Sequence, residues 1–592
     1  MSNEFYVRKG LAIGTASLDE SVTSPRVLVL GTDNVVRYRD NISGSVNDAA
    51  PTFSVQLSTG TGLTGFGVID YGRGSVLLNR PGAQLPSGGF SGFSNTFIGA
   101  SAGVSTTSGG NTYLGYKAGF ANTTGTNNTF VGNCASGNVS TANNANTLVG
   151  HFAGCGLPST GSGCNTIVGA LSGNTSNAVG LGAANTLIGA ESAKAGTGTA
   201  LAKAVFVGFQ TGMTASGSDN TLLGHQAGMS TGAGIQNTFV GSCAGFQNTT
   251  GNANVFLGVQ AGFRGSGVSC NTFVGFTSGR EATGACNTYV GALSGAKSTT
   301  GACNTLVGFQ SGCNVVEGGL NTFVGNSSGI NVQYGTSNVL IGERAGCGLT
   351  HSFNVMIGAE TGQSTSMATG SVFVGYRAGA GSTCHMNIFV GERAGENSTN
   401  GKRNVFMGIC AGQNATSAQD AVYIGLYAGR DSGVIQSVLI GAEAGVAAGA
   451  VNTMIGYQAG SLAQSTSQEN VFVGTGAAYD TSTGCQNVVV GRFAGRLLKV
   501  GCGNTMVGYY AGCCSVFGCN NTFIGYCSGI QTAPGFYMCN SIAIGVCAEP
   551  TANNQLVIAS SAVPLGTAST GTFNQFLCAR INGQNFRIPL YT

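Results

Sequence analysis

Charged side chains are scarce in this chain of 592 residues, since Asp, Glu, Lys and Arg together make up only 8% of it, against about 25% in ordinary globular proteins. The formal net charge is +3, and no basic run occurs. Because binding to a phosphate backbone depends on clustered Lys and Arg, we expect no nucleic-acid partner. A surface this poor in charge is also unlike that of a solvated enzyme.

Long apolar runs are absent as well. Nowhere do 18 apolar residues follow one another, and the first thirty residues lack a basic start followed by an apolar segment. The sequence therefore predicts no membrane insertion and no signal peptide. We expect the chain to assemble in the cytoplasm of the cell that makes it.

The residues that usually carry chemistry do not cluster. The four histidines (His151, His225, His351, His385) lie far apart, no CxxC pair has a matching second pair, and no acidic column repeats. A match to GxG such as Gly474-Thr475-Gly476 is expected by chance in a chain with 101 glycines. We predict no catalytic residue, no cofactor and no metal site, and hence no enzyme.

What the sequence has is a repeat. A phrase of the form Asn-(Thr or Val)-(large apolar)-(Val, Ile or Leu)-Gly occurs 27 times between Asn95 and Gly545, with closing glycines 15 to 20 residues apart. This period is too short for a helical pair and suits one coil of a β-solenoid, in which each coil is stabilised by its neighbours. If each phrase is one coil, strands about 4.8 Å apart give a rod of about 130 Å.

Within the phrase, the third residue before glycine is β-branched in all 27 coils, which favours a strand. Strand alternation places this residue and the aliphatic residue just before glycine on one face, and the large residue between them on the other. Three residues after the glycine comes Ala, Ser or Thr, followed by Gly in 23 coils. This pair, as in Ala118-Gly119, indicates a tight inward corner with a positive φ.

Both strand faces are therefore apolar, and a single-walled solenoid would leave one of them in water. We expect the small face to be internal and the stripe of large residues to be covered by other chains. The predicted inter-chain core consists of the phenylalanines of this stripe: Phe97, Phe130, Phe206, Phe239, Phe256, Phe273, Phe323, Phe373, Phe389, Phe406, Phe472 and Phe523.

Asparagine opens the phrase in 22 coils. Stacking in register would align these amides into a ladder that hydrogen-bonds along the axis, which is a structural role. The predicted ladder includes Asn95, Asn111, Asn128, Asn271, Asn287, Asn304 and Asn321.

Cysteine occurs 20 times, and several cysteines recur at a fixed phase of the repeat. Cys164, Cys270, Cys286 and Cys303 precede the asparagine directly, while Cys134, Cys243, Cys410, Cys527 and Cys547 lie two residues after the glycine. Stacked coils are close enough for a disulfide only with suitable side-chain geometry. Since we expect assembly in a reducing compartment, we predict free thiols that serve packing.

The last coil, Asn540-Ser541-Ile542-Ala543-Ile544-Gly545, resembles the NSVAIG repeat in the heads of trimeric autotransporter adhesins of the YadA type. The other coils resemble the NT(A/F)(V/L)G-xx-AG arrays of phage and large-virus fibre proteins. The resemblance implies a left-handed parallel β-roll that assembles as a homotrimer. The opening Glu4-Phe5-Tyr6-Val7 is similar to the start of virion fibre proteins, and residues 579–591 are similar to a fibre terminus that closes as a hairpin.

The expected architecture is all-β: a β-rich attachment base in residues 1–94, a shaft of about 27 coils of a trimeric left-handed parallel β-solenoid in residues 95–549, and a cap in residues 550–592. The expected function is that of a virion or tail fibre, a rigid spacer whose N-terminal base contacts the virion. The partner at the host surface would be a glycan or receptor.

Two other functions remain open. One is a bacterial extracellular adhesin or filament subunit exported by an unconventional route. The other is an ice-binding solenoid with a flat array of threonines. We expect the ice-binding alternative to be weaker, because the Thr position exchanges freely with Val and Ile, as a buried position would.

Overall fold

The computed structural model describes residues 94–558, apart from 138–143, 156, 158–161, 175–180, 195–200, 366–367, 384, 465 and 531–536. Outside this range it describes only the strands named below. The described residues form strands and turns, and no helix. The chain divides into two units, Met1–Cys303 and Asn304–Thr592, each of which is considered by itself. No described segment could cross a membrane as a helix.

The first unit begins with seven strands that precede the repeats. β1 (Tyr6–Val7) pairs with β2 (Leu11–Ala12), and β3 (Arg26–Leu30) pairs with β4 (Val36–Asp40) and β5 (Thr52–Thr59). β5, β6 (Leu63–Asp70) and β7 (Ser75–Asn79) form an antiparallel meander. β7 then pairs in parallel with the first repeat strand, so the pairing direction changes from antiparallel to parallel here.

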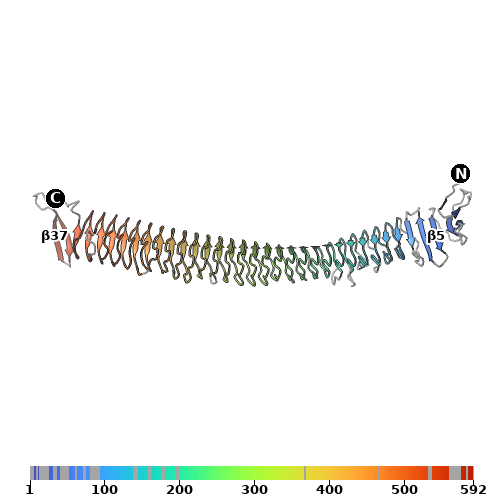
Figure 1. Ribbon diagram of the computed structural model, residues 1–592, viewed down its shortest axis with the longest axis horizontal. Coiled ribbons are helices and arrows are strands. Elements are labelled where there is room, and N and C mark those ends of the chain that lie inside the picture. Colours follow the sequence, from blue (N-terminus) through green and yellow to red (C-terminus); the bar gives the residue numbers. More distant parts are fainter. Residues whose placement is uncertain are drawn as a thin grey trace. The chain divides into compact units, whose positions relative to one another are not determined.

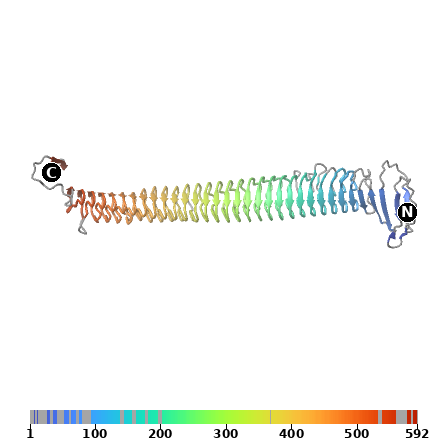
Figure 2. The ribbon, with the colours of Figure 1, turned by 90° about the horizontal axis from the view of Figure 1, so that it is seen from above.

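Twelve repeat strands follow in the first unit, each made of the three residues before a closing glycine. Each pairs in parallel with the next, and the arrows lie side by side (Figures 1 and 2). They are β8 (Thr96–Ile98), β9 (Thr112–Leu114), β10 (Thr129–Val131), β11 (Thr147–Val149), β12 (Thr166–Val168), β13 (Thr186–Ile188), β14 (Val205–Val207), β15 (Thr221–Leu223), β16 (Thr238–Val240), β17 (Val255–Leu257), β18 (Thr272–Val274) and β19 (Thr288–Val290).

The second unit continues the pattern with fifteen repeat strands and one further parallel strand, β35. Its last two strands, β36 (Gln575–Ile581) and β37 (Gln584–Leu590), form an antiparallel hairpin. The stacked strands are β20 (Thr305–Val307), β21 (Thr322–Val324), β22 (Val339–Ile341), β23 (Val355–Ile357), β24 (Val372–Val374), β25 (Ile388–Val390), β26 (Val405–Met407), β27 (Val422–Ile424), β28 (Val438–Ile440), β29 (Thr453–Ile455), β30 (Val471–Val473), β31 (Val488–Val490), β32 (Thr505–Val507), β33 (Thr522–Ile524), β34 (Ile542–Ile544) and β35 (Leu556–Ile558).

Register is strict, so that each phrase position forms a column along the stack. In β16 and β17, Phe239 pairs with Phe256, and Thr238 pairs with Val255. All 27 phrases found in the sequence thus become strands of a parallel β-solenoid, as expected from their period. The variable residues between phrases form the turns and the return path of each coil.

The middle residue of every repeat strand, which is large in all strands except β34, lies inside the chain's own solenoid, where it is buried. Rings on successive coils stack face to face: the centroids of Phe239, Phe256, Phe273 and Tyr289 are 4.7, 4.9 and 4.8 Å apart. The spacing of the rings is close to the ordinary distance between neighbouring strands. The core of each unit is therefore a single file of large side chains.

The predicted inter-chain core is wrong for this reason. A ring that is enclosed by its own coil has no surface left for a partner chain, and none of the twelve predicted phenylalanines is more than 2% exposed. They are Phe97, Phe130, Phe206, Phe239, Phe256, Phe273, Phe323, Phe373, Phe389, Phe406, Phe472 and Phe523.

Two glycines make this narrow interior possible: one that lies four residues after the closing glycine and is present in 23 of the 27 coils, and the closing glycine itself. Gly245, with φ +60°, lies so close to the ring of Phe239 that an added Cβ would come within 2.4 Å of it. The closing glycine Gly241 has φ +137°, and a Cβ there would lie 2.4 Å from the carbonyl oxygen of Gly258 on the next coil. The first glycine lets the two walls approach, and the second lets neighbouring coils stack closely.

Candidate functional site

The two outer positions of each repeat strand point away from the core and form the outward sheet face. This face carries the Thr or Val column at the third position before the closing glycine and the aliphatic column just before it. These side chains are partly or clearly exposed, as at Val205 (40%), Leu223 (45%) and Ile388 (42%). The face assignment made from the sequence was therefore inverted: the small β-branched column faces outward.

The outward sheet face differs between the two units. In the first unit, ten of the twelve residues in the β-branched column are threonine, and the exceptions are Val205 and Val255. In the second unit, ten of fifteen are valine or isoleucine, including an unbroken run over seven strands. This run consists of Val339, Val355, Val372, Ile388, Val405, Val422 and Val438.

The asparagine column forms a hydrogen-bonded ladder. Asn254 is fully buried; its backbone N–H donates to Oδ1 of Asn237 over 3.0 Å, and its own Oδ1 accepts from the N–H of Asn271 over 2.9 Å. The amide Nδ2 of Asn254 donates to Asn237 Oδ1 and to the carbonyl of Val268. Each amide thus satisfies backbone groups on two neighbouring coils, which is a structural role.

The predicted members of this ladder are joined in the same way. Asn111 donates to Asn95, Asn128 to Asn111, Asn287 to Asn271, and Asn321 to Asn304. Where serine replaces asparagine, as at Ser371, its hydroxyl accepts a hydrogen bond from the backbone N–H of Asn387, the equivalent residue of the next coil. Ala204 and Ala421 accept no such bond through a side chain, although their own N–H groups donate to Asn185 and Asn404.

Charged groups on the return side pair along the axis. Arg377 Nε lies 2.8 Å from Glu396 Oε1, and its guanidinium is 3.8 Å from Glu360. These carboxylates raise the pKa of Arg377, with Glu396 contributing most. Likewise, the hydrogen bond from Arg403 lowers the pKa of Asp420. Such pairs link neighbouring coils: Glu396 is buried, whereas Arg403 and Asp420 are exposed, and an exposed pair contributes little to stability.

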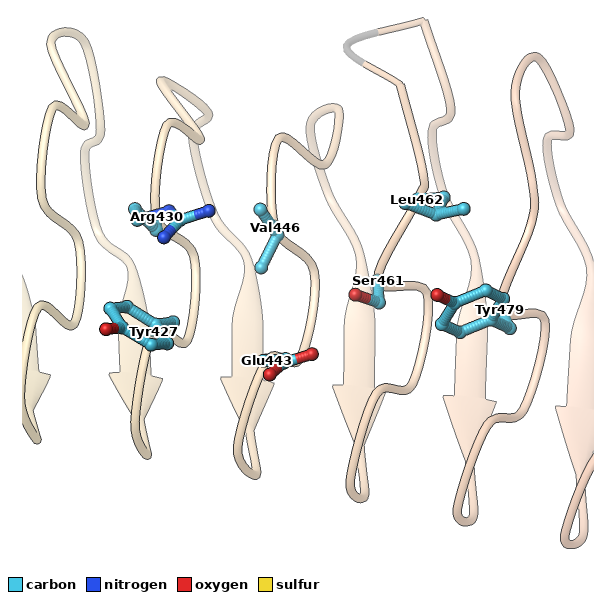
Figure 3. A pocket seen from close by; sticks show the side chains of 7 residues that line it. All are labelled: Tyr427, Arg430, Glu443, Val446, Ser461, Leu462 and Tyr479. Atoms are coloured by element: carbon cyan, nitrogen blue, oxygen red, sulfur yellow. The ribbon is translucent and has the colours of Figure 1, made fainter.

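A groove of about 300 Å³ opens on the surface of the second unit. Its lining side chains come from four consecutive coils, those of β27 to β30, with a tyrosine at either end (Figure 3). All come from the segments two, five or six residues after the closing glycine. The lining residues are Tyr427, Arg430, Glu443, Val446, Ser461, Leu462 and Tyr479.

The groove combines aromatic, apolar and polar groups. The guanidinium of Arg430 lies 4.8 Å from the ring centroid of Tyr427 and 3.4 Å from the carboxylate of Asp431. Glu443 accepts a hydrogen bond from Gln458 over 2.8 Å. These residues were not predicted from the sequence, because the positions after the glycine vary in type and only their common phase shows that they share one side.

The cysteines occupy columns, as their phase indicated. Cys270, Cys286 and Cys303 are exposed free thiols, whereas Cys485 and Cys502 form a disulfide, with Cα atoms 4.6 Å apart. The expectation of free thiols is thus wrong for this pair. Within the part of the chain that the structure describes, no three or more His, Cys, Asp or Glu side chains form a group that could hold a metal.

Comparison with known proteins adds no relative: no protein-family model, curated protein or solved structure matches this chain.

Proposed function

We propose that the chain is a structural fibre protein, with a mechanical and not a catalytic role, and that its outward sheet face is covered by further copies of the same chain. The observation that carries this proposal is the exposed apolar face. In the second unit, all fifteen residues just before the closing glycine and ten of fifteen in the β-branched column are apolar.

The size of this face supports self-association. Fifteen strands spaced about 4.8 Å apart and about 10 Å long give an area of about 700 Å². The largest apolar patch on a typical monomer covers about 300 to 600 Å², and each partner in a stable interface buries about 800 Å². A face of this size, left in water, would favour association over a soluble monomer.

The repeat supports a biological setting for this proposal. Its resemblance to phage and large-virus fibre arrays and to the heads of trimeric adhesins supports a homotrimer on a virion or tail. There the N-terminal base would contact the particle and the shaft would act as a spacer for host attachment. The groove between Tyr427 and Tyr479 is a candidate contact for a host-surface glycan, since sugar rings stack on aromatic side chains and bond to polar ones.

The solution mass of the purified chain in reducing buffer tests the assembly. Light scattering should give three times 59.1 kDa. Replacing Ile388 and Val405 together by lysine should yield monomers, because the charges lie on the outward face. Asn400→Lys with Ser417→Lys, at exposed turn positions, is the matched control and should leave the trimer intact. A wild-type monomer would contradict the proposal.

An ice-binding function is the second candidate, and one observation favours it. The threonine column of the first unit faces outward at regular intervals, so the expectation that this column is buried, which counted against ice binding, no longer holds. A freezing-hysteresis assay on the wild type and on Thr272→Lys with Thr288→Lys decides the matter. Hysteresis that the double substitution abolishes would establish ice binding in place of the fibre.

A further inference from the structure

Eight cysteines lie between residues 485 and 547, and six of them form two columns at the C-terminal end of the solenoid. Cys485, Cys502, Cys519 and Cys539 each lie six residues before the closing glycine of four consecutive coils. Cys527 and Cys547 each lie two residues after the closing glycine of the last two repeat coils. Consecutive coils therefore place like cysteines side by side.

The first of these pairs is already a disulfide. Cys485 and Cys502 face each other in a parallel bridge, and their Cα separation of 4.6 Å falls within the range that disulfides adopt. The stacking of coils thus supplies suitable geometry at this phase of the repeat without displacement of the backbone.

Cys519 and Cys539 repeat this arrangement between the coils of β33 and β34. The backbone N–H of Cys519 lies 3.3 Å from Sγ of Cys539, and the N–H of Asn540 donates to the carbonyl of Cys519 over 2.9 Å. The parallel bridge between Phe517 and Tyr537 fixes the same register two residues earlier. Both thiols are free and partly exposed, so that small oxidants can reach them.

Cys527 and Cys547 lie on the same two coils, after the closing glycine and not before it. Each donates its N–H to the coil before it, Cys527 to Tyr509 and Cys547 to Tyr526, which holds the two residues at equivalent places in the stack. Both are free and partly exposed. The junction between β33 and β34 is therefore flanked by two pairs of thiols.

We propose that the C-terminal end of the solenoid is an oxidative cross-linking site, in which Cys519–Cys539 and Cys527–Cys547 become disulfides that fasten the last repeat coil to its neighbour. Only one further stacked strand, β35, follows β34, so this coil lies next to the end of the stack, where a solenoid opens first. Covalent links at this junction oppose that opening.

The chemistry requires an electron acceptor, and a low-molecular-weight disulfide such as oxidised glutathione suffices. One thiolate attacks a sulfur of this disulfide and releases one small thiol. The second cysteine then attacks the mixed disulfide and releases the other. For each link, two protein thiols lose two electrons and two protons, and one small disulfide becomes two small thiols.

Thiol mapping on the full-length chain tests the proposal. The chain is reduced, treated with oxidised glutathione, alkylated and digested with chymotrypsin, because no Lys or Arg lies between Lys499 and Arg580. Cleavage after Phe517, Phe523, Tyr526 and Tyr537 separates Cys519 from Cys527 and both from their partners. The expected products are the peptides of Cys519 and Cys527, each linked to the peptide that follows Tyr537.

Variants assign the links and test their effect. Cys539→Ser should leave only the link to Cys527, and Cys547→Ser only the link to Cys519. In the oxidised wild type, amide exchange in residues 541–548 should slow at least tenfold and recover after reduction. Cys270→Ser with Cys286→Ser, in another column, is the control and should change neither result. Complete alkylation of Cys519 and Cys527 in the folded, oxidised wild type would overturn the proposal.

Discussion

At the scale of single residues, the asparagine ladder is the feature whose loss is easiest to predict. Asn254→Ala would leave the N–H of Asn271 and the carbonyl of Val268 without their side-chain partner, in a place that water does not reach. Each buried group left unpaired costs about 1 to 3 kcal/mol, so we expect a local loss of about 2 to 6 kcal/mol for the two groups.

Amide exchange measured in the neighbouring coils would report this loss. Asn254→Ser is the matched control, because Ser371 and Ser437 already accept the ladder bond through their hydroxyls at equivalent positions. The serine variant should lose less than half as much stability. Equal exchange in the alanine variant and the wild type would show that the ladder contributes nothing.

A buried tyrosine should make the stability of the second unit fall at alkaline pH. Burial raises the pKa of Tyr423 to about 12, against an ordinary value of 10. The folded chain thus keeps the neutral phenol while the unfolded chain ionises it. The contribution is complete below pH 10 and falls by about 1.4 kcal/mol per pH unit from pH 10 to pH 12.

Tyr423→Phe should therefore flatten the decline in the thermal midpoint between pH 10 and pH 11. The cost at pH 8 should be small, since the phenol makes only long contacts with Ser432 and Val434, at 3.5 and 3.4 Å. Tyr457→Phe, at an exposed position, controls for the change of residue type. An unchanged slope for Tyr423→Phe would contradict the buried-phenol explanation.

Most of the fold could be predicted from the sequence because the repeat specifies strands and register, but the prediction that the small face is internal was wrong. Thr238, Phe239 and Val240 alternate correctly between faces, yet all three can pack in an apolar environment. The deciding fact is steric. Gly245 faces the ring of Phe239 across the interior, and a Cβ at Gly245 would come within 2.4 Å of that ring. The prediction that the Ala-Gly pair forms an inward corner was correct, but its position opposite the phenylalanine was not predicted.

At the scale of the coil, the closing glycine controls stacking. Gly441→Ala would place a Cβ 2.4 Å from the carbonyl oxygen of Gly456, at a φ of +134° that alanine rarely adopts. Because that contact is with the backbone of the next coil, no side-chain movement relieves it. We expect a loss of more than about 3 kcal/mol, or separation of the coils on either side.

Gly433→Ala is the matched control within the same unit, since its nearest contact would be an ordinary 3.4 Å to the Thr416 hydroxyl, and its φ is not positive. This change should be neutral or slightly stabilising, because alanine has less freedom in the unfolded chain. Thermal unfolding followed by circular dichroism would separate the two outcomes. Similar midpoints for both variants would show that coils tolerate a wider spacing than their close stacking implies.

At the scale of the whole molecule, the groove could not be predicted from the repeat, whereas the cysteine columns could. Tyr427 and Tyr479 lie in different coils and at different phases, two and five residues after the glycine, so no local motif joins them. The stacking of four coils places them at the two ends of one groove. The cysteine columns carried a clearer signal, because their fixed phase already placed like residues on neighbouring coils.

The contrast between the outward faces leads to a prediction about assembly. Val372→Thr with Val405→Thr keeps the shape of each side chain and replaces one methyl by a hydroxyl. If the outward sheet face of the second unit is buried between chains, each hydroxyl that loses water without a hydrogen-bond partner costs about 1 to 3 kcal/mol. The dissociation constant of the assembly should rise at least tenfold in sedimentation equilibrium.

The reverse exchange tests whether the first unit takes part in the same contact. Thr238→Val with Thr272→Val adds apolar surface to a column that is mostly threonine, and it should strengthen assembly if that column is also covered. If only the second unit is covered, the threonine substitutions there weaken assembly while the valine substitutions here leave the dissociation constant unchanged. If neither pair of variants alters it, the chains associate through another surface, and the apolar face needs a different partner.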